Sequence, residues 1–205
     1  MIKKKIVLAL IVFTFIFVLI GCTDKATINT YSDPSFSKNT ITKLAVFPMK
    51  NTKLAPSESR TINRKIAQGI KDTDPTIEII SASEATKVMN REGLTDKWAD
   101  FLDDYSSSGV PNTDTLFKVG DALGVDGIMQ GEIVNIVQAD GHYGWNGGVS
   151  QVTVRYSILG TDSGKLLWEA TSEGRKDTLT TLEDAPPLIE AIMLAQEKII
   201  ENLPF

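Results

Sequence analysis

The chain has 205 residues, with 21 Lys and Arg against 26 Asp and Glu, and its net charge at pH 7 is -5. A surface of this sign does not attract nucleic acid or anionic lipid headgroups, so those partners are not expected. The sequence holds one cysteine and one histidine. A single cysteine excludes a disulfide within the chain and a CxxC metal or redox site, and a single histidine argues against a zinc site.

The N-terminal segment has the pattern of a signal peptide. Lysines at positions 3–5 precede an apolar run over residues 6–20 that only Thr14 interrupts. A helix of about 15 residues is roughly 22 Å long, whereas a bilayer span needs about 20 residues. We therefore expect a cleaved signal peptide over residues 1–21 rather than a permanent span. Its removal would take away three lysines and no acidic residue, leaving 18 basic and 26 acidic residues and a net charge of -8.

Cys22 follows the apolar run directly, in the stretch Leu19-Ile20-Gly21-Cys22. This stretch resembles the bacterial lipobox. The resemblance implies that Cys22 becomes the mature N-terminus and receives a diacylglycerol and an N-acyl chain such as palmitate; no cofactor is expected besides these lipids. Several acyl chains, at about 0.8 kcal/mol for each buried methylene, make such an anchor lasting. The alternatives are a buried free thiol or an ordinary signal peptide that happens to carry a cysteine.

The residues after Cys22 bear on where the protein is held. In the sorting rule of Gram-negative lipoproteins an Asp after the cysteine favours the inner membrane, so Thr23 favours the outer membrane. Residues 22–41 are rich in Thr, Ser, Asn and Asp without a sustained period, which is typical of a flexible tether. A coil of about 18 residues averages roughly 25 Å end to end, so the domain stays near the periplasmic face of its membrane. Tyr31 and Phe36 are expected to dock the tether's end.

A single α/β domain is predicted over residues 42–205, and it opens with a β-α-β order. Residues 44–47 are a compact apolar run typical of a buried strand. Isoleucines at 62, 66 and 70 recur every four residues and predict an amphipathic helix. Residues 76–80 supply a second, β-branched strand after the break at Asp74-Pro75.

Three helical segments follow. Ser81 and Glu84 have the spacing of a capping box and open a helix that ends near Gly93. Asn112 can cap the third of these helices, which ends at Gly124. The second carries an aromatic stripe that we predict to pack into the core rather than to grip a partner: Trp98, Phe101, Leu102 and Tyr105.

The C-terminal part predicts three strands and a last helix. Residues 127–138 are apolar on both faces, as in a central strand, and residues 151–158 alternate, as in a strand with one wet face. Residues 166–171 return as the partner of a hairpin, and apolar positions over 188–200 predict a terminal helix that covers the sheet. The predicted fold class is therefore α/β, a mixed sheet of about five strands flanked by helices in the order β-α-β-α-α-α-β-β-β-α.

Three stretches resemble, at matching places, the periplasmic lipoproteins related to the curli secretion channel CsgG: LAVFP at 44–48, LGVDGIMQG at 123–131 and GTDSGKLLWE at 160–169. This superfamily includes lipoprotein activators of penicillin-binding proteins and resembles the N-terminal domain of TolB. The resemblance covers most of residues 42–202. It implies a CsgG/TolB N-terminal-like fold and a place in the bacterial cell envelope.

The leading interpretation is a non-enzymatic, outer-membrane lipoprotein that acts as an adaptor or assembly factor through contacts with envelope proteins or with itself. The first alternative is a ring-forming subunit of a CsgG-like secretion or export channel. A self-made pore is disfavoured because the loop over 139–148 is too short for two membrane strands of about 9 to 11 residues each. The third option is a cell-wall enzyme or an activator of a peptidoglycan synthase. No small-molecule substrate is predicted.

The loop over 139–148 also holds His142 beside Tyr143 and Trp145. No G-x-S-x-G elbow, H-E-x-x-H motif or P-loop accompanies the histidine, so no catalytic, cofactor-binding or metal-ligating residue is assigned. Three interpretations stay open for these residues: a plain hairpin loop, a contact surface for a partner or membrane, and a catalytic group.

Structural roles are predicted for the acidic residues discussed next. Asp126 stands between a helix end and a strand, where its carboxylate can hydrogen-bond the turn. The pairs Asp72 with Asp74 and Asp103 with Asp104 could flank a bond in a glycosidase. Because these pairs fall at a helix end and on a polar helix face, we predict solvated surface charge instead.

Overall fold

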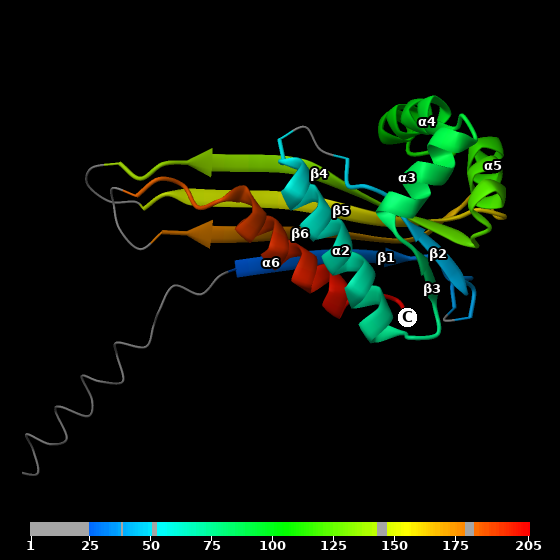
Figure 1. Ribbon diagram of the computed structural model, residues 1–205. Coiled ribbons are helices and arrows are strands. Elements are labelled where there is room, and N and C mark those ends of the chain that lie inside the picture. Colours follow the sequence, from blue (N-terminus) through cyan, green and yellow to red (C-terminus); the bar gives the residue numbers. More distant parts are fainter. Residues whose placement is uncertain (1–24, 38, 51–52, 143–146, 179–182) are drawn as a thin grey trace, which may run out of the picture.

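The computed structural model describes residues 25–37, 39–50, 53–142, 147–178 and 183–205. Six strands form one mixed sheet in the order β1-β6-β5-β4-β2-β3. The strands are β1 (Lys25–Ser32), β2 (Lys43–Val46), β3 (Glu78–Ile80), β4 (Gly127–Ala139), β5 (Val149–Gly160) and β6 (Leu166–Asp177). Strand β2 runs parallel to β3 and β4, whereas β4, β5, β6 and β1 are successively antiparallel. The predicted α/β class is confirmed, with one strand more than expected (Figure 1).

The additional strand is β1, in a segment for which the sequence predicted a tether without regular structure. All eight residues of β1 pair with β6, from Lys25 opposite Arg175 to Ser32 opposite Trp168. The strand lies at the sheet edge and exposes most of its side chains, and Ile28 is its contact with the core. A strand that buries so little needs no apolar alternation, because backbone hydrogen bonds to one neighbour hold it. The expected docking of Phe36 is confirmed by an edge-to-face contact with Phe205.

One face of the sheet is covered by two helices, α2 (Pro56–Thr73) and α6 (Leu188–Glu201), which cross it obliquely (Figure 1). The predicted stripe of Ile62, Ile66 and Ile70 is fully buried there. The alternating side chains of β5 enter the same core, among them Tyr156, whose hydroxyl accepts a hydrogen bond from Gln196 Nε2 at 2.8 Å. Among the described residues, no helix combines the length and the apolar character needed to cross a membrane.

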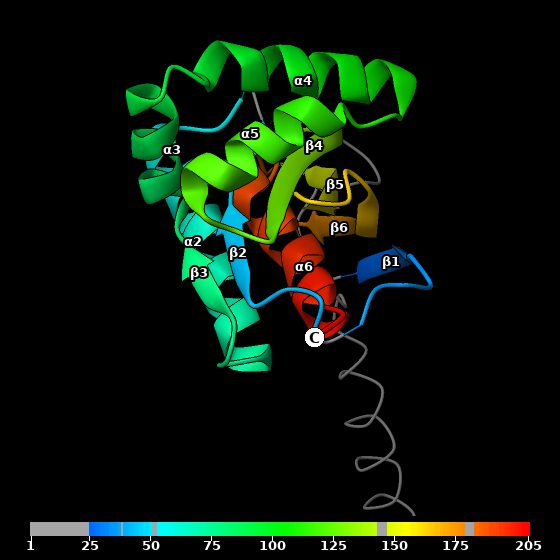
Figure 2. The ribbon, with the colours of Figure 1, turned by 90° about the vertical axis from the view of Figure 1, so that its right-hand side faces the viewer.

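The other face is covered only at one end, by α3 (Ala82–Arg91), α4 (Thr95–Ser108) and α5 (Thr113–Leu123) (Figure 2). The predicted capping box of Ser81 and Glu84 is present at the start of α3. The aromatic stripe packs into the core for two of its four residues: the rings of Trp98 and Phe101 stack with centroids 4.7 Å apart, and both are buried. Leu102 and Tyr105 are half-buried and pack against the same core. Beyond these helices, this face of β4, β5, β6 and β1 bears mainly polar side chains, with Val137 and Tyr31 as exposed exceptions.

Asp126 has the structural role that the sequence predicted, although its partners lie in another strand. Its Oδ2 accepts hydrogen bonds from Thr42 N, Thr42 Oγ1 and Lys43 N at 2.8, 2.6 and 3.0 Å. Burial opposes ionisation, but these hydrogen bonds hold the pKa of Asp126 below its usual value. A Cβ on the neighbouring Gly127 would lie 2.7 Å from Ile41, so glycine permits the close approach here. Asp126 therefore fixes the start of β2 against the start of β4.

The prediction of solvated charge is wrong for Asp74. This residue is 3% exposed and ends α2, where its Oδ1 accepts hydrogen bonds from Thr76 N and Oγ1 at 3.0 and 2.6 Å. The carboxylate is buried because it closes the turn that Pro75 begins. Asp103, by contrast, lies on the surface of α4 and pairs with Lys50.

Candidate functional site

The loop between β4 and β5 was the sequence's candidate contact surface. His142 is exposed, and its Nδ1 lies 3.0 Å from the carbonyl oxygen of Asp140. Tyr143 and Trp145 lie outside the described residues. The loop is braced by the connection between β6 and α6, because Ala185 N donates to Asp140 Oδ1 at 2.8 Å and Gly141 N donates to Glu183 O at 3.0 Å. These hydrogen bonds hold the start of the loop after β4 against the segment that precedes α6.

The predicted lipidation site, Cys22, also lies outside the described residues, together with the signal peptide and Thr23. Strand β1 begins three residues after Cys22 in the sequence, at Lys25. Lys25 pairs with Arg175, which pairs with Gln151, which in turn pairs with Val137. This row crosses the sheet just before the loop between β4 and β5. The chain thus enters the domain at the hairpin end of the sheet, opposite the end that α3, α4 and α5 cover (Figure 1).

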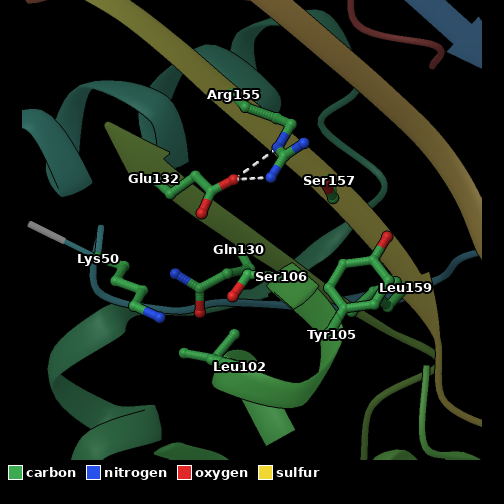
Figure 3. Close-up of a pocket in the computed structure, with 9 residues that line it drawn as sticks. All are labelled: Lys50, Leu102, Tyr105, Ser106, Gln130, Glu132, Arg155, Ser157 and Leu159. Carbon is green, nitrogen blue, oxygen red and sulfur yellow. Dashed lines mark hydrogen bonds and ion pairs between the residues drawn. The ribbon is translucent and has the colours of Figure 1, made fainter. Parts of the chain in front are cut away.

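A small pocket lies between α4 and the uncovered sheet face (Figure 3). Strands β4 and β5 place two cross-strand pairs beneath it, Gln130 with Ser157 and Glu132 with Arg155. Helix α4 supplies the opposite wall, and Lys50 closes one side. The cavity measures about 20 Å³ and is lined by Lys50, Leu102, Tyr105, Ser106, Gln130, Glu132, Arg155, Ser157 and Leu159.

The charges around the pocket form a paired network. The guanidinium of Arg155 donates through Nε to Glu132 Oε1 at 2.5 Å and lies 3.9 Å from Glu169. Ser157 Oγ donates to Glu169 at 2.9 Å, and Lys50 Nζ lies 2.6 Å from Asp103 Oδ1. Ser157 is buried, but the charged side chains of this network are partly or largely exposed, so their ion pairs orient side chains more than they stabilise the fold.

Tyr105 lies at the rim of this network. Burial raises the pKa of the Tyr105 hydroxyl, and the carboxylates of Glu169 and Glu132 add to the shift while Arg155 opposes it. The phenol therefore stays protonated, mainly because it is partly buried.

Gln130 is the buried polar group at the centre of the pocket. The residue is 8% exposed, and its Nε2 donates to the carbonyl oxygens of Pro48 and Gly131 at 3.0 and 2.7 Å. Its Oε1 is buried without a hydrogen-bond partner among the described residues. A buried acceptor left unpaired costs about 1–3 kcal/mol, so a donor is expected beside it.

The Ser157 hydroxyl in the pocket donates to Glu169, and His142 lies at the hairpin end of the sheet. No group of three or more His, Cys, Asp or Glu side chains in the described part of the chain is placed to hold a metal ion. Sequence reasoning missed this site because its residues come from separate segments. The one local signal was a glutamine inside the apolar run Ile128-Met129-Gln130.

No protein-family model matches the chain, and no curated protein matches it significantly. Among solved structures, the PelC dodecamer from Paraburkholderia phytofirmans is similar at 14% identity, over 84% of this chain and 94% of that chain, with a TM-score of 0.48. Lipoprotein GNA1162 from Neisseria meningitidis is similar at 14% identity, over 78% and 99%, with a TM-score of 0.47.

The LpoB C-terminal domain from Salmonella enterica is similar at 10% identity, over 72% of this chain and 88% of that chain, with a TM-score of 0.39. At scores below 0.5 these similarities identify neither a family nor an activity for this chain.

Proposed function

We propose that this chain is a non-enzymatic lipoprotein of the bacterial outer membrane, anchored through Cys22 and acting as an adaptor or assembly factor in a cell-envelope complex. The observation that carries the proposal is the position of β1. The chain enters the sheet at Lys25, three residues after the lipobox cysteine, and it does so at the hairpin end. An acylated Cys22 would hold this end at the membrane.

The distance between anchor and domain is short. Three residues span at most about 10 Å, in place of the longer tether expected from composition. The loop containing His142 lies at this same end and would face the membrane, with Tyr143 and Trp145 as the expected contacts. The pocket, the polar sheet face and helices α3, α4 and α5 would remain accessible to proteins of the periplasm. An adaptor held in this way meets partners close to the same membrane.

The anchor is tested by Cys22→Ser, with Ser37→Ala as a matched control at an exposed polar position. We expect the wild-type chain and the control to fractionate with membranes and to carry the added mass of the lipids. We expect Cys22→Ser to lose both the added mass and the resistance to washing. Unchanged mass and membrane binding in Cys22→Ser would overturn the proposal.

A ring-forming subunit is the second candidate, and the free edges of the sheet favour it. Beyond Ile133, β4 pairs only with β5 among the described strands, and β1 pairs only with β6. Strand β1 runs antiparallel to β4, so copies standing the same way up on a membrane could join one protomer's β1 to the next protomer's β4. Such a contact is head-to-tail and closes into a ring when the rotation allows it.

Thr30→Pro separates the two candidates. Asp33 N donates to Leu167 O across the sheet, so the odd-numbered residues of β1 direct their backbone groups toward β6 and the even-numbered ones face outward. Proline at position 30 removes an outward N–H and spares the ladder to β6. A discrete ring in electron micrographs of wild-type protein that Thr30→Pro abolishes would support the ring. A monomer in both would support the adaptor.

A further inference from the structure

The orientation of the Gln130 side chain is fixed by its partners. Its Nε2 donates to two carbonyl oxygens, those of Pro48 and Gly131. A reversed amide would place an oxygen against both carbonyls, with no hydrogen to share. Figure 3 shows the amide oxygen on the side of α4, where Oε1 is buried with almost no accessible surface and has no partner among the described residues. Gln130 Oε1 is thus an unpaired hydrogen-bond acceptor at the pocket.

The size of the pocket limits that donor. A cavity of about 20 Å³ holds one group the size of a water molecule. Arg155 contacts Glu132 through Oε1, and Figure 3 shows the other carboxylate oxygen on the side of Gln130. The side chains of Leu102 and Leu159 line the same cavity and could pack against an aliphatic stem.

The charges favour a cation over a neutral donor. Two positive groups near the pocket, Lys50 and Arg155, are each paired with carboxylates. These carboxylates, with Glu169, outnumber them by one: Glu132, Asp103 and Glu169. Burial is the main cause of the raised pKa of Tyr105, to which Glu169 and Glu132 add and which Arg155 opposes. Lys50 does not itself occupy the pocket, because its ammonium lies on Asp103.

A groove along β4 adjoins the pocket. It has a volume of about 330 Å³ and is lined by Lys50, Lys53 and residues 132–136. The groove shares Lys50 and Glu132 with the pocket. An extended segment lying beside β4 could therefore place a side chain beneath α4.

We propose that the pocket binds a primary ammonium group, with Gln130 Oε1 and the carboxylate of Glu132 as acceptors. The group is the end of a lysine side chain when it comes from a partner protein, or a free alkylamine. This inference concerns recognition alone and does not depend on lipidation of Cys22.

The test is a titration of the full-length chain in detergent, followed by nuclear magnetic resonance of the Gln130 side-chain amide and the Gly131 backbone amide. We expect n-butylammonium to give saturable shifts at millimolar concentration. We expect binding at least tenfold weaker for n-butanol, which lacks the charge, and for tetramethylammonium, which lacks N–H donors. Equal response to all three probes, or no saturable response, would overturn the proposal.

Variants locate the binding. Gln130→Met keeps the size of the side chain and removes the acceptor, so we expect the affinity for n-butylammonium to fall at least tenfold. Gln151→Met, on the same face of the sheet, is the matched control and should leave this affinity unchanged. If Gln130→Met fails to fold, Ser106→Leu narrows the pocket from an exposed position of α4 and is expected to block binding. Undiminished binding in the folded variant would overturn the assignment. Binding seen only in Lys50→Met would show Lys50 to be the native occupant and would also overturn it.

A titration with a lysine-containing peptide distinguishes the two possible sources of the ammonium group. An extended pentapeptide with a central lysine reaches both the pocket and the β4 groove. Tighter binding of this peptide than of butylammonium, with additional shifts at residues 133–136, would support a lysine of a partner protein. Equal binding without those shifts would support a free amine.

Discussion

The two faces of the sheet differ along a single strand, β5. Val152, Val154 and Ile158 point to α2 and α6 and are fully buried, whereas Gln151, Thr153 and Arg155 on the other face are partly exposed. The first face gives apolar burial and hence stability. The second face keeps hydrogen-bonding and charged groups within reach of solvent, and it contains the pocket. Over residues 151–155, β5 thus separates the apolar core from a polar face, and substitutions on the two faces of this part of the strand should differ in the same way.

Truncation within the helix-covered core should give the largest effect. Ile66 is fully buried beneath the sheet, and Ile66→Ala leaves a cavity. We expect a loss of about 2–5 kcal/mol in the free energy of unfolding, measured by urea denaturation. Thr153→Ala on the other face is the matched control and should change stability by less than about 0.5 kcal/mol. Similar losses in the two variants would contradict the division between faces.

Overpacking on the same face should come next. Gly174 of β6 lies against α6, and a Cβ there would collide with Ala191 O and approach Ala195 N to 2.7 Å. These are backbone atoms that cannot rotate away, so Gly174→Ala should cost about 1–3 kcal/mol. Calorimetric melting measures the effect, with Thr171→Ala on the opposite face of β6 as the control. A melting temperature for Gly174→Ala equal to that of the control would show that α6 can shift freely.

Asp126 connects the starts of β2 and β4, and its substitution should have an intermediate effect on stability. Asp126→Ala removes three hydrogen bonds to Thr42 and Lys43 and should cost about 1–2 kcal/mol. Because the folded-state pKa is lowered, the contribution is present above the unfolded value near pH 4 and is lost as the pH falls through the folded value. Melting of wild type and variant from pH 7 to pH 2 should therefore converge at low pH. A difference in melting temperature that stayed constant from pH 7 to pH 2 would show that the ionised carboxylate of Asp126 does not stabilise the fold.

The smallest effect should come from the polar face. Arg155 is partly exposed between Glu132 and Glu169, and such pairs contribute little. We expect Arg155→Met to change the free energy of unfolding by less than about 1 kcal/mol in urea denaturation. A loss above about 2 kcal/mol in the free energy of unfolding would show that this network stabilises the fold strongly. That result would contradict the proposed difference between the two faces.

The parts predicted from sequence are those that local pattern determines. The stripe of Ile62, Ile66 and Ile70, the capping box at Ser81 and the alternation of β5 were each sufficient to identify an element. Strand β1 was missed because an edge strand is held by backbone pairing, which leaves little side-chain pattern.

Burial and sites formed between distant segments were harder to predict. Asp74 was assigned to solvent because a carboxylate at a helix end is usually solvated; its burial depends on the turn to Thr76. The pocket joins Tyr105, Gln130 and Arg155 through packing of α4 on the sheet, and no spacing within one segment records that contact. The role of Asp126 was recognised, but its partners, 84 and 83 residues away, were not.

The proposed arrangement on the membrane is tested most directly by fluorescence quenching of the full-length lipoprotein in vesicles. A dye is placed at His142→Cys, at the hairpin end, or at Ser106→Cys, on α4, with Cys22 occupied by its lipids. Quenchers attached to lipid headgroups should quench the dye at position 142 strongly and the dye at position 106 only weakly. Equal quenching at both positions, or stronger quenching at 106, would contradict an anchor that holds the hairpin end at the membrane.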